Sequence, residues 1–119
     1  MNKISYWAYP SIISRKSTSS RDEATALSII KRVCEDTGIL KCLLEGRTRK
    51  REVVEARQIA MFFIKKKTHM SLKGIGLLFG GRDHSTVIHA NQTVTDLIEY
   101  DKKFQQKVEM IEYNLYFQK

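Results

Sequence analysis

The chain has 119 residues, carries 21 Lys and Arg against 13 Asp and Glu, and has a formal net charge of +8 with a sequence pI near 9.6. A chain of this length builds one domain with a modest core and leaves no room for a second catalytic module. The positive charge predicts attraction to polyanions, with nucleic acid first and an acidic membrane surface second.

Neither a membrane span nor a disulfide framework is indicated. No apolar run approaches the roughly 20 residues that cross a bilayer, and the N-terminus lacks the apolar region of a secretory signal, so we expect a cytoplasmic protein. Cys34 and Cys42 lie eight positions apart, without a CxxC motif or a nearby cluster of His and Cys. They predict reduced, partly buried thiols and no metal site.

The first 20 residues show no sustained periodicity. Three aromatic residues, Tyr6, Trp7 and Tyr9, precede the only proline and the Ser/Thr-rich stretch SIISRKSTSS. This composition predicts an arm or linker over residues 1–20, followed by a domain over residues 21–119. The aromatic residues favour docking of the arm, including on a protein partner, and a disordered terminus is an equal alternative.

A helical pattern begins at Asp22 and stops at Gly38. Its apolar residues, spaced by three and four, are Ala26, Ile29, Ile30, Val33 and Cys34. The segment ILKCLLEG then predicts one or two helical turns that end at Gly46. The basic run RTRKR follows, and leads into the next helix.

The segment EVVEARQIAMFFIKKK predicts a long and largely buried helix. The residues expected to be buried are Val54, Ile59, Met61, Phe62, Phe63 and Ile64. Its last turn carries Lys65, Lys66 and Lys67, where cations suit the negative end of the helix dipole. Simple solvation of this triplet is slightly favoured over phosphate contact.

Ser71 is a favourable N-cap for the next segment, SLKGIGLLF. The core stripe of this segment consists of Leu72, Ile75, Leu78 and Phe79. Gly74 and Gly76 each cost roughly 1 kcal/mol relative to alanine inside a helix, so they predict the close approach of another helix. Gly80 and Gly81 predict a tight turn with positive φ.

Asp83 is expected to cap a further helix through its side-chain oxygen. The inward face of that helix consists of Val87, Ala90, Asn91, Val94, Leu97 and Ile98. The last stretch, YDKKFQQKVEMIEYNLYF, predicts a packing helix that closes the domain, with Phe104, Val108, Ile111 and Leu115 facing inward. No strand-period alternation persists, so the predicted fold class is all-α.

A short helix, a glycine turn and a second helix are the parts of a helix-turn-helix, in which the second helix enters the major groove by its N-terminal end. This geometry explains why GGRDHSTVIHA, residues 80–90, places its most polar residues directly after the glycines. An Asp accepts from cytosine N4, a His donates to guanine, and a hydroxyl bonds to a base or a phosphate. RTRKR is then either an arm in the neighbouring minor groove or a solvated basic loop.

GGRDHSTVIHA, SLKGIGLLF and EARQIAMFFIKKKT together resemble the C-terminal DNA-binding domain, domain IV, of the bacterial replication initiator DnaA. The resemblance covers about residues 25–100. It implies a helical bundle with a helix-turn-helix, similar to that of the Trp repressor. It further implies a nucleoid-associated protein that binds DnaA-box-like sites in double-stranded DNA as a monomer, without a cofactor, in replication initiation or its regulation.

The resemblance also implies roles for single residues. Major-groove base contacts are implied for Asp83, His84 and Ser85, and a minor-groove base contact for Arg49. Phosphate or supporting contacts are implied for Arg57, Gln58, Lys65, Ser71, Leu72, Arg82 and Thr86.

Three departures from the family pattern predict a shifted or relaxed site preference. Glu55 and Ala56 stand where the family usually has Arg-Pro, which removes one positive charge near the DNA face. Ser85 replaces a frequent Thr, whose methyl group would contact a thymine methyl. Lys73 replaces a frequent proline.

Two function hypotheses remain open, and an enzyme is the weakest alternative. The initiator's ATPase motif, GxxxxGK[ST], is absent, which favours a stand-alone duplex DNA-binding protein. The second hypothesis is an interaction module that keeps the fold and binds a protein partner through the N-terminal arm and the C-terminal helix. Asp83, His84 and Ser85 would point in different directions on a helix, so they do not form a nucleophile relay. His84 and His89 are separated by roughly 140° around the helix, which makes them poor metal co-ligands.

Overall fold

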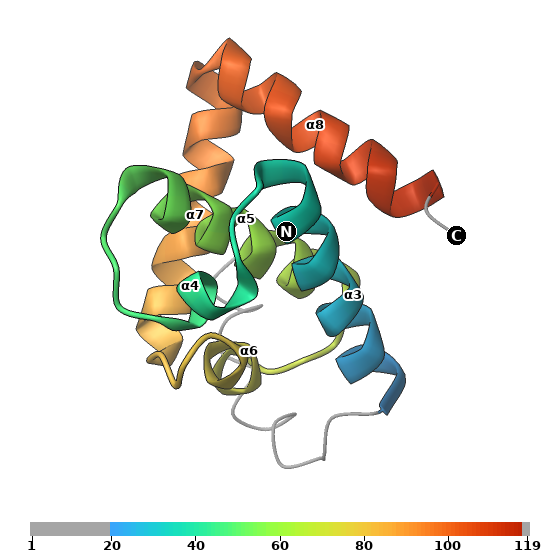
Figure 1. Ribbon diagram of the computed structural model, residues 1–119, viewed down its shortest axis with the longest axis vertical. Helices are drawn as coiled ribbons and strands as arrows, with labels where there is room; N and C mark the ends of the chain where they lie inside the picture. The colour runs from blue at the N-terminus through green and yellow to red at the C-terminus, as the bar shows by residue number, and fades with distance from the viewer. Residues whose placement is uncertain (1–19, 118–119) are drawn as a thin grey trace, which may run out of the picture.

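The structure is a computed structural model that describes residues 20–117 (Figure 1). This part of the chain contains six helices and no strand. The helices are α3 (Ser20–Thr37), α4 (Lys41–Glu45), α5 (Arg51–Lys67), α6 (Leu72–Leu78), α7 (His84–Tyr100) and α8 (Lys102–Phe117). The all-α prediction is confirmed, while the predicted arm lies, apart from Ser20, outside the described residues.

Helix α5 forms the centre of the core, with α3 and α7 packed against it (Figure 1). Its buried residues are Val53, Ala56, Arg57, Ile59, Ala60, Met61, Phe63 and Ile64. The predicted long and largely buried helix is confirmed, but Val54 and Phe62 are only half-buried. Because neighbours cover α5 on more than one side, small residues such as Ala56 and Ala60 are buried where a single apolar stripe does not predict it.

Helix α3 begins at Ser20, two residues before the predicted start at Asp22. It buries Ala26, Ile29, Ile30 and Val33. Its end is as predicted, since Gly38 has a φ of 76° and its N–H donates to the carbonyl of Cys34 at 2.8 Å. A left-handed residue at this position satisfies a helix-end carbonyl that would otherwise lack a partner.

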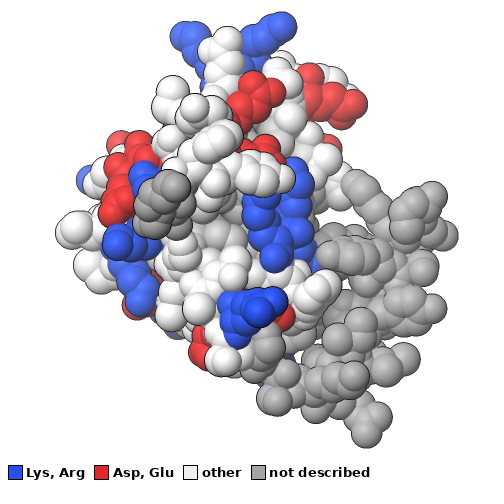
Figure 2. Space-filling model, turned by 90° about the vertical axis from the view of Figure 1, so that its right-hand side faces the viewer, with Lys and Arg blue, Asp and Glu red and all other residues white. Residues whose placement is uncertain are grey.

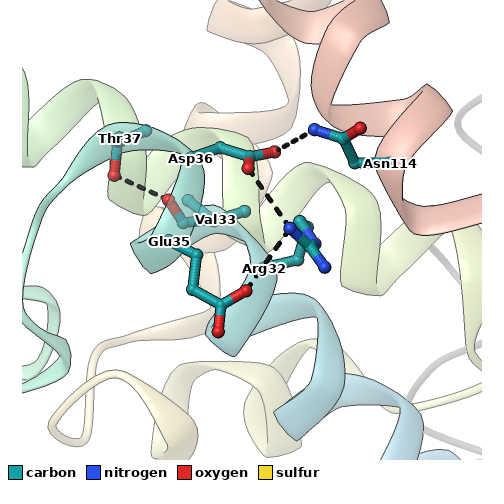
Figure 3. A network of polar contacts seen from close by, with 6 residues as sticks. All are labelled: Arg32, Val33, Glu35, Asp36, Thr37 and Asn114. Carbon is teal, nitrogen blue, oxygen red and sulfur yellow. Dashed lines mark hydrogen bonds and ion pairs between the residues drawn. The ribbon is translucent and has the colours of Figure 1, made fainter. Parts of the chain in front are cut away.

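Helix α8 closes the domain as expected, with Phe104, Val108 and Ile111 buried. Polar contacts fasten its outer half to the end of α3 (Figure 3). Asn114 Nδ2 donates to Asp36 Oδ2 at 2.9 Å, and the other oxygen of Asp36 lies 3.4 Å from Arg32 Nη1. The C-terminal end of α3 therefore binds α8 through side chains as well as through the core.

The lysines at the end of α5 also hold α8. Lys66 Nζ lies 3.2 Å and Lys67 Nζ 3.8 Å from Glu112 Oε2, and Lys67 lies over the ring of Tyr116 at 4.5 Å. These two lysines therefore contact α8, while Lys66 also remains exposed to solvent.

Glu55, which stands where the family usually has a different residue, forms an ion pair in the fold. Lys107 Nζ of α8 lies 2.6 Å from Glu55 Oε1. The carboxylate is therefore paired with a lysine at the domain surface, which makes its repulsion of a phosphate smaller than the sequence suggests.

Both cysteines are free thiols, with Cys34 half-buried and Cys42 exposed. Burial is the main cause that raises the pKa of Cys34. Between residues 20 and 117, no helix combines the length and the apolarity that a bilayer crossing requires. Within the same range, His, Cys, Asp and Glu side chains do not gather in threes that would hold a metal ion.

Candidate nucleic-acid interface

The first helix of the predicted helix-turn-helix is α6. Its N-cap is Ser71, whose Oγ accepts a hydrogen bond from the N–H of Gly74 at 3.0 Å. Leu72, Ile75 and Phe79 are buried, so the predicted core stripe is confirmed for these three, and Leu78 is half-buried. Ser71 and Leu72 thus fix how α6 begins and how it packs.

A glycine turn joins α6 to α7. Gly80 and Gly81 have φ values of 84° and 76°, which confirms the predicted positive φ. The N–H groups of Phe79 and Arg82 both donate to the carbonyl of Gly76, at 3.1 and 2.9 Å. The turn is thus folded back onto the helix that precedes it.

The close approach at Gly76 comes from this turn and not from another helix. A Cβ on Gly76 would lie 2.1 Å from the carbonyl oxygen of Arg82. The prediction that another helix approaches Gly76 is therefore wrong, although another part of the backbone does approach it closely. A glycine inside a helical segment indicates a close approach but not its partner, because the sequence of one helix does not reveal which backbone folds onto it.

Asp83 caps α7 as predicted. Its Oδ1 accepts from the N–H of His84 at 2.8 Å, its Oδ2 accepts from Ser85 Oγ at 2.8 Å, and Oδ1 lies 3.1 Å from His84 Nδ1. These hydrogen bonds, first that of Ser85 and then that of His84, lower the pKa of Asp83. The expectation that the three side chains point in different directions is wrong, because both neighbours contact Asp83.

This cluster does not form a nucleophile relay. A relay requires the hydroxyl to donate to the imidazole and the imidazole to donate to the carboxylate. Here Ser85 donates directly to Asp83, and His84 contacts the other oxygen of the same carboxylate. The arrangement orders the first turn of a helix.

The first turn of α7 projects into solvent. The side chains of Asp83 and His84 are 68% and 63% exposed, and Ser85 and Thr86 are also exposed. Further along the helix, Val87, Ala90 and Val94 are buried and hold it to the core. The polar N-terminal end of the helix is therefore exposed to solvent, while its apolar face packs against the domain.

Gly46 and the first four residues of the basic run form a loop, residues 46–50, between α4 and α5, and the last residue of the run, Arg51, begins α5. The loop lies on the same side of the molecule as α7 (Figure 1), and Arg49 is exposed. A hollow separates it from the start of α7, with Arg47 on one side and Arg82, Asp83 and Thr86 on the other. Sequence reasoning did not single out Arg47, although it belongs to the same basic run.

The remaining predicted site residues differ in their exposure. Gln58, Lys65, Ser71 and Arg82 are half-buried, whereas the side chains of Arg57 and Leu72 are buried. Arg57 is 6% exposed, and its Nε donates to the carbonyl of Leu44 at 2.9 Å. Burial and then the charge of Arg82 lower the pKa of Arg57. The guanidinium of Arg57 therefore faces the protein interior.

Positive charge also occurs away from the helix-turn-helix. Figure 2 views the side that faces right in Figure 1, and shows Lys and Arg side chains in separate groups among acidic and uncharged surface. On the face that Figure 2 shows, the described Lys and Arg side chains therefore do not form one continuous patch. Positive charge attracts polyanions without regard to sequence, because phosphate contacts carry no sequence information.

The cap at Asp83 makes the stability of the domain depend on pH. Because its pKa is lowered from the ordinary value of 3.8, the contribution of the charged cap is complete above that value and is lost as the pH falls through the lowered pKa. Urea unfolding at neutral and acidic pH is expected to show that the difference between the wild type and Asp83→Ala shrinks in acid. Asp83→Asn keeps an uncharged acceptor, and its difference from Asp83→Ala is expected to stay constant. If the difference between the wild type and Asp83→Ala also stayed constant with pH, the charged carboxylate of Asp83 would not stabilise the helix.

Helices α6 and α7 pack against each other and are joined by a glycine turn, and the polar residues at the start of α7 are ordered and exposed. This arrangement defines a helix-turn-helix DNA-binding domain. The family model described as bacterial dnaA protein helix-turn-helix matches residues 26–94. The chain belongs to this family. The matched module is a DNA-binding one and not a catalytic one.

Similar relatives carry the name chromosomal replication initiator protein DnaA. The chain is 47% identical over 83 residues to that of Thermus thermophilus, covering 70% of this chain and 19% of the relative. It is 45% identical over 84 residues to that of Bacteroides thetaiotaomicron, covering 71% and 18%. It is 52% identical over 69 residues to that of Flavobacterium psychrophilum, covering 58% and 14%. The chain spans about a fifth or less of the length of these relatives.

Proposed function

We propose that this chain binds double-stranded DNA at DnaA-box-like sites as a monomer, in replication initiation or its regulation. The observation that carries the proposal is the ordered polar turn at the start of α7, beside a basic loop that a hydrogen bond from Arg82 ties to the same turn. One domain thus offers a helix end for the major groove and an arginine for the neighbouring minor groove. We expect such a protein at the nucleoid.

Base reading is assigned to four exposed residues. Asp83, His84 and Ser85 meet the major-groove edges, and Arg49 enters the minor groove. Because the hydroxyl of Ser85 donates its hydrogen bond to Asp83, the Ser85 oxygen keeps lone pairs that accept from a base amino group. With Nδ1 beside Asp83, His84 presents Nε2 to the groove.

The other residues orient the domain on the duplex. Lys65, Gln58 and Thr86 are assigned to phosphates, which fix register without reading sequence. Ser71 and Leu72 act indirectly, because one caps α6 and the other packs it into the core. Lys73, exposed on α6, adds positive charge beside these contacts.

The test is a fluorescence-anisotropy titration of the chain against a duplex with a DnaA box and against a scrambled duplex of equal length, at near-physiological salt and over a salt series. We expect clear preference for the box. Preference is the signature of base readout, because phosphate contacts alone bind all sequences alike. Equal binding would reject box recognition in favour of an electrostatic interaction.

Lys65→Ala is expected to weaken binding to the box and to the scrambled duplex by the same factor. Loss of one phosphate contact should also reduce the slope of log K against log salt by about 1. Lys103→Ala is the matched control, because Lys103 is exposed at the start of α8, beyond the far end of α7. A loss confined to the box duplex would assign Lys65 to base reading instead.

A module that binds a protein partner is the second candidate. In its favour, α8 exposes Met110, Tyr113, Tyr116 and Phe117, and Phe117 packs against both tyrosines. Aromatic residues and methionine are enriched at protein interfaces. Absence of binding to either duplex at low salt would favour this candidate, since DNA binding should strengthen steeply as salt falls.

A further inference from the structure

Two guanidinium groups from separate parts of the chain meet at one backbone carbonyl. Arg82, in the turn before α7, donates to the carbonyl of Gly46. Arg57 Nη2, from the middle of α5, donates to the same oxygen at 3.3 Å. Gly46 is the first residue of the basic loop, so this oxygen joins the loop, the central helix and the helix-turn-helix.

Arg57 makes a series of such bonds. Besides Nε to Leu44, its Nη2 donates to the carbonyls of Leu43 at 3.1 Å and Thr48 at 3.4 Å. Leu43 and Leu44 lie in the last turn of α4, where helix carbonyls lack partners within the helix. Thr48 lies directly before Arg49. One buried side chain therefore holds the backbone from the end of α4 to the residue beside the arginine assigned to the minor groove.

The helix-turn-helix contacts the same segment by its backbone. A Cβ on Gly80 would lie 2.2 Å from the carbonyl oxygen of Glu45. The turn thus rests directly on the end of α4, and Arg82 bonds to the next residue of the chain. Helix α4 has only five residues, which is too short to be stable by itself. Its position depends on these contacts.

We propose that Arg57 is a positioning residue that fixes the basic loop relative to α7, so that Arg49 and the start of α7 reach their two grooves in one register. It acts through Arg49 and does not bind a phosphate, because it is buried and its donors are taken by backbone carbonyls: Nε donates to one, and the two N–H groups of Nη2 are shared among three. This proposal rests on the proposed DNA binding, and adds to it the residue that connects the two protein segments assigned to the two grooves.

The first experiment needs no DNA. Arg57→Lys keeps the charge but offers a compact ammonium in place of the planar fork. Hydrogen exchange should be faster by about ten-fold or more for the loop amides of Gly46 and Lys50. The first donates to the carbonyl of Leu43 and the second to the side-chain Oγ1 of Thr48. The amides of α7 should keep their rates. Arg51→Lys, at the exposed start of the same helix, is the matched control. Unchanged exchange in the loop would overturn the proposal.

The second experiment tests the link to Arg49 on DNA. Replacing adenine by 2,6-diaminopurine in the box adds an amino group to the minor groove and leaves the major-groove edge unchanged. We expect this change to weaken wild-type binding by about ten-fold, as for one base contact. Arg49→Ala and Arg57→Lys should both lose this sensitivity. Their double variant should bind no more weakly than the weaker single one, whereas Arg57→Lys and His84→Ala should have multiplying effects.

The outcomes separate the two proposals. Multiplying effects of Arg57→Lys and Arg49→Ala, or full sensitivity to diaminopurine in Arg57→Lys, would overturn the positioning role while box preference stands. A wild type without box preference rejects the proposed function, and hydrogen exchange then decides by itself whether Arg57 holds the loop. If Arg57→Lys does not fold, Arg57→Gln, which keeps a planar amide donor at this position, replaces it in both experiments.

Discussion

Gly80→Ala is expected to destabilise the domain by about 2–5 kcal/mol and to abolish most of its selective DNA binding. Two costs coincide at this residue. Its φ of 84° is unfavourable for a residue with a Cβ, and that Cβ would lie 2.2 Å from the carbonyl oxygen of Glu45. Since the obstacle is backbone, the turn or α4 must move. Urea unfolding followed by circular dichroism measures the loss.

Gly81→Ala is the matched control for this variant. Gly81 has a similar φ of 76°, but a Cβ there would meet nothing within 4 Å. Its expected cost is therefore the backbone strain alone, about 1–2 kcal/mol. Equal losses for the two variants would show that contact between the turn and the end of α4 does not constrain the fold.

His84→Ala is expected to cost about 1–3 kcal/mol of binding free energy to the box duplex, which is roughly five- to 150-fold in Kd. The reason is loss of a side chain assigned to a base edge. The side chain is 63% exposed, so its removal leaves no cavity in the core. Binding to the scrambled duplex should change little, and the preference for the box should fall accordingly in anisotropy titrations.

His89→Ala is the control for His84→Ala. His89 is exposed on the same helix, and lies roughly 140° around the axis from His84. Any effect of His89→Ala should be equal for both duplexes, since a phosphate contact carries no sequence information. If His84→Ala behaves in the same way, His84 does not read bases.

Most helices could be predicted because their signals are local. The three-and-four spacing in α3, the cap at Ser71, the paired glycines and the cap at Asp83 each depend on residues within a few positions of one another. The confirmed elements are those whose hydrogen bonds close within one turn, such as Ser71 to Gly74. Predictions about which face of α5 is buried were less accurate, because burial there depends on four neighbouring helices, α3, α4, α6 and α7.

Partners far apart in the sequence could not be predicted. Lys107 and Glu55, or Asn114 and Asp36, meet only because α8 folds back across the domain. Gly76 signalled a close approach, but its partner is the carbonyl of Arg82. Arg57 was expected at a phosphate or in a supporting position. Its burial favours the supporting one.

By itself, the sequence determined that the chain is helical, where its turns fall, and which polar residues stand at the start of α7. These features follow from backbone conformation, capping and apolar periodicity, which act over a few residues. The fold, and no local pattern, brings the basic loop and the helix-turn-helix to the carbonyl of Gly46 and places Arg57 at this junction. The physical reason is that a buried guanidinium takes whichever carbonyls the fold brings to it, and no spacing along the chain encodes that choice.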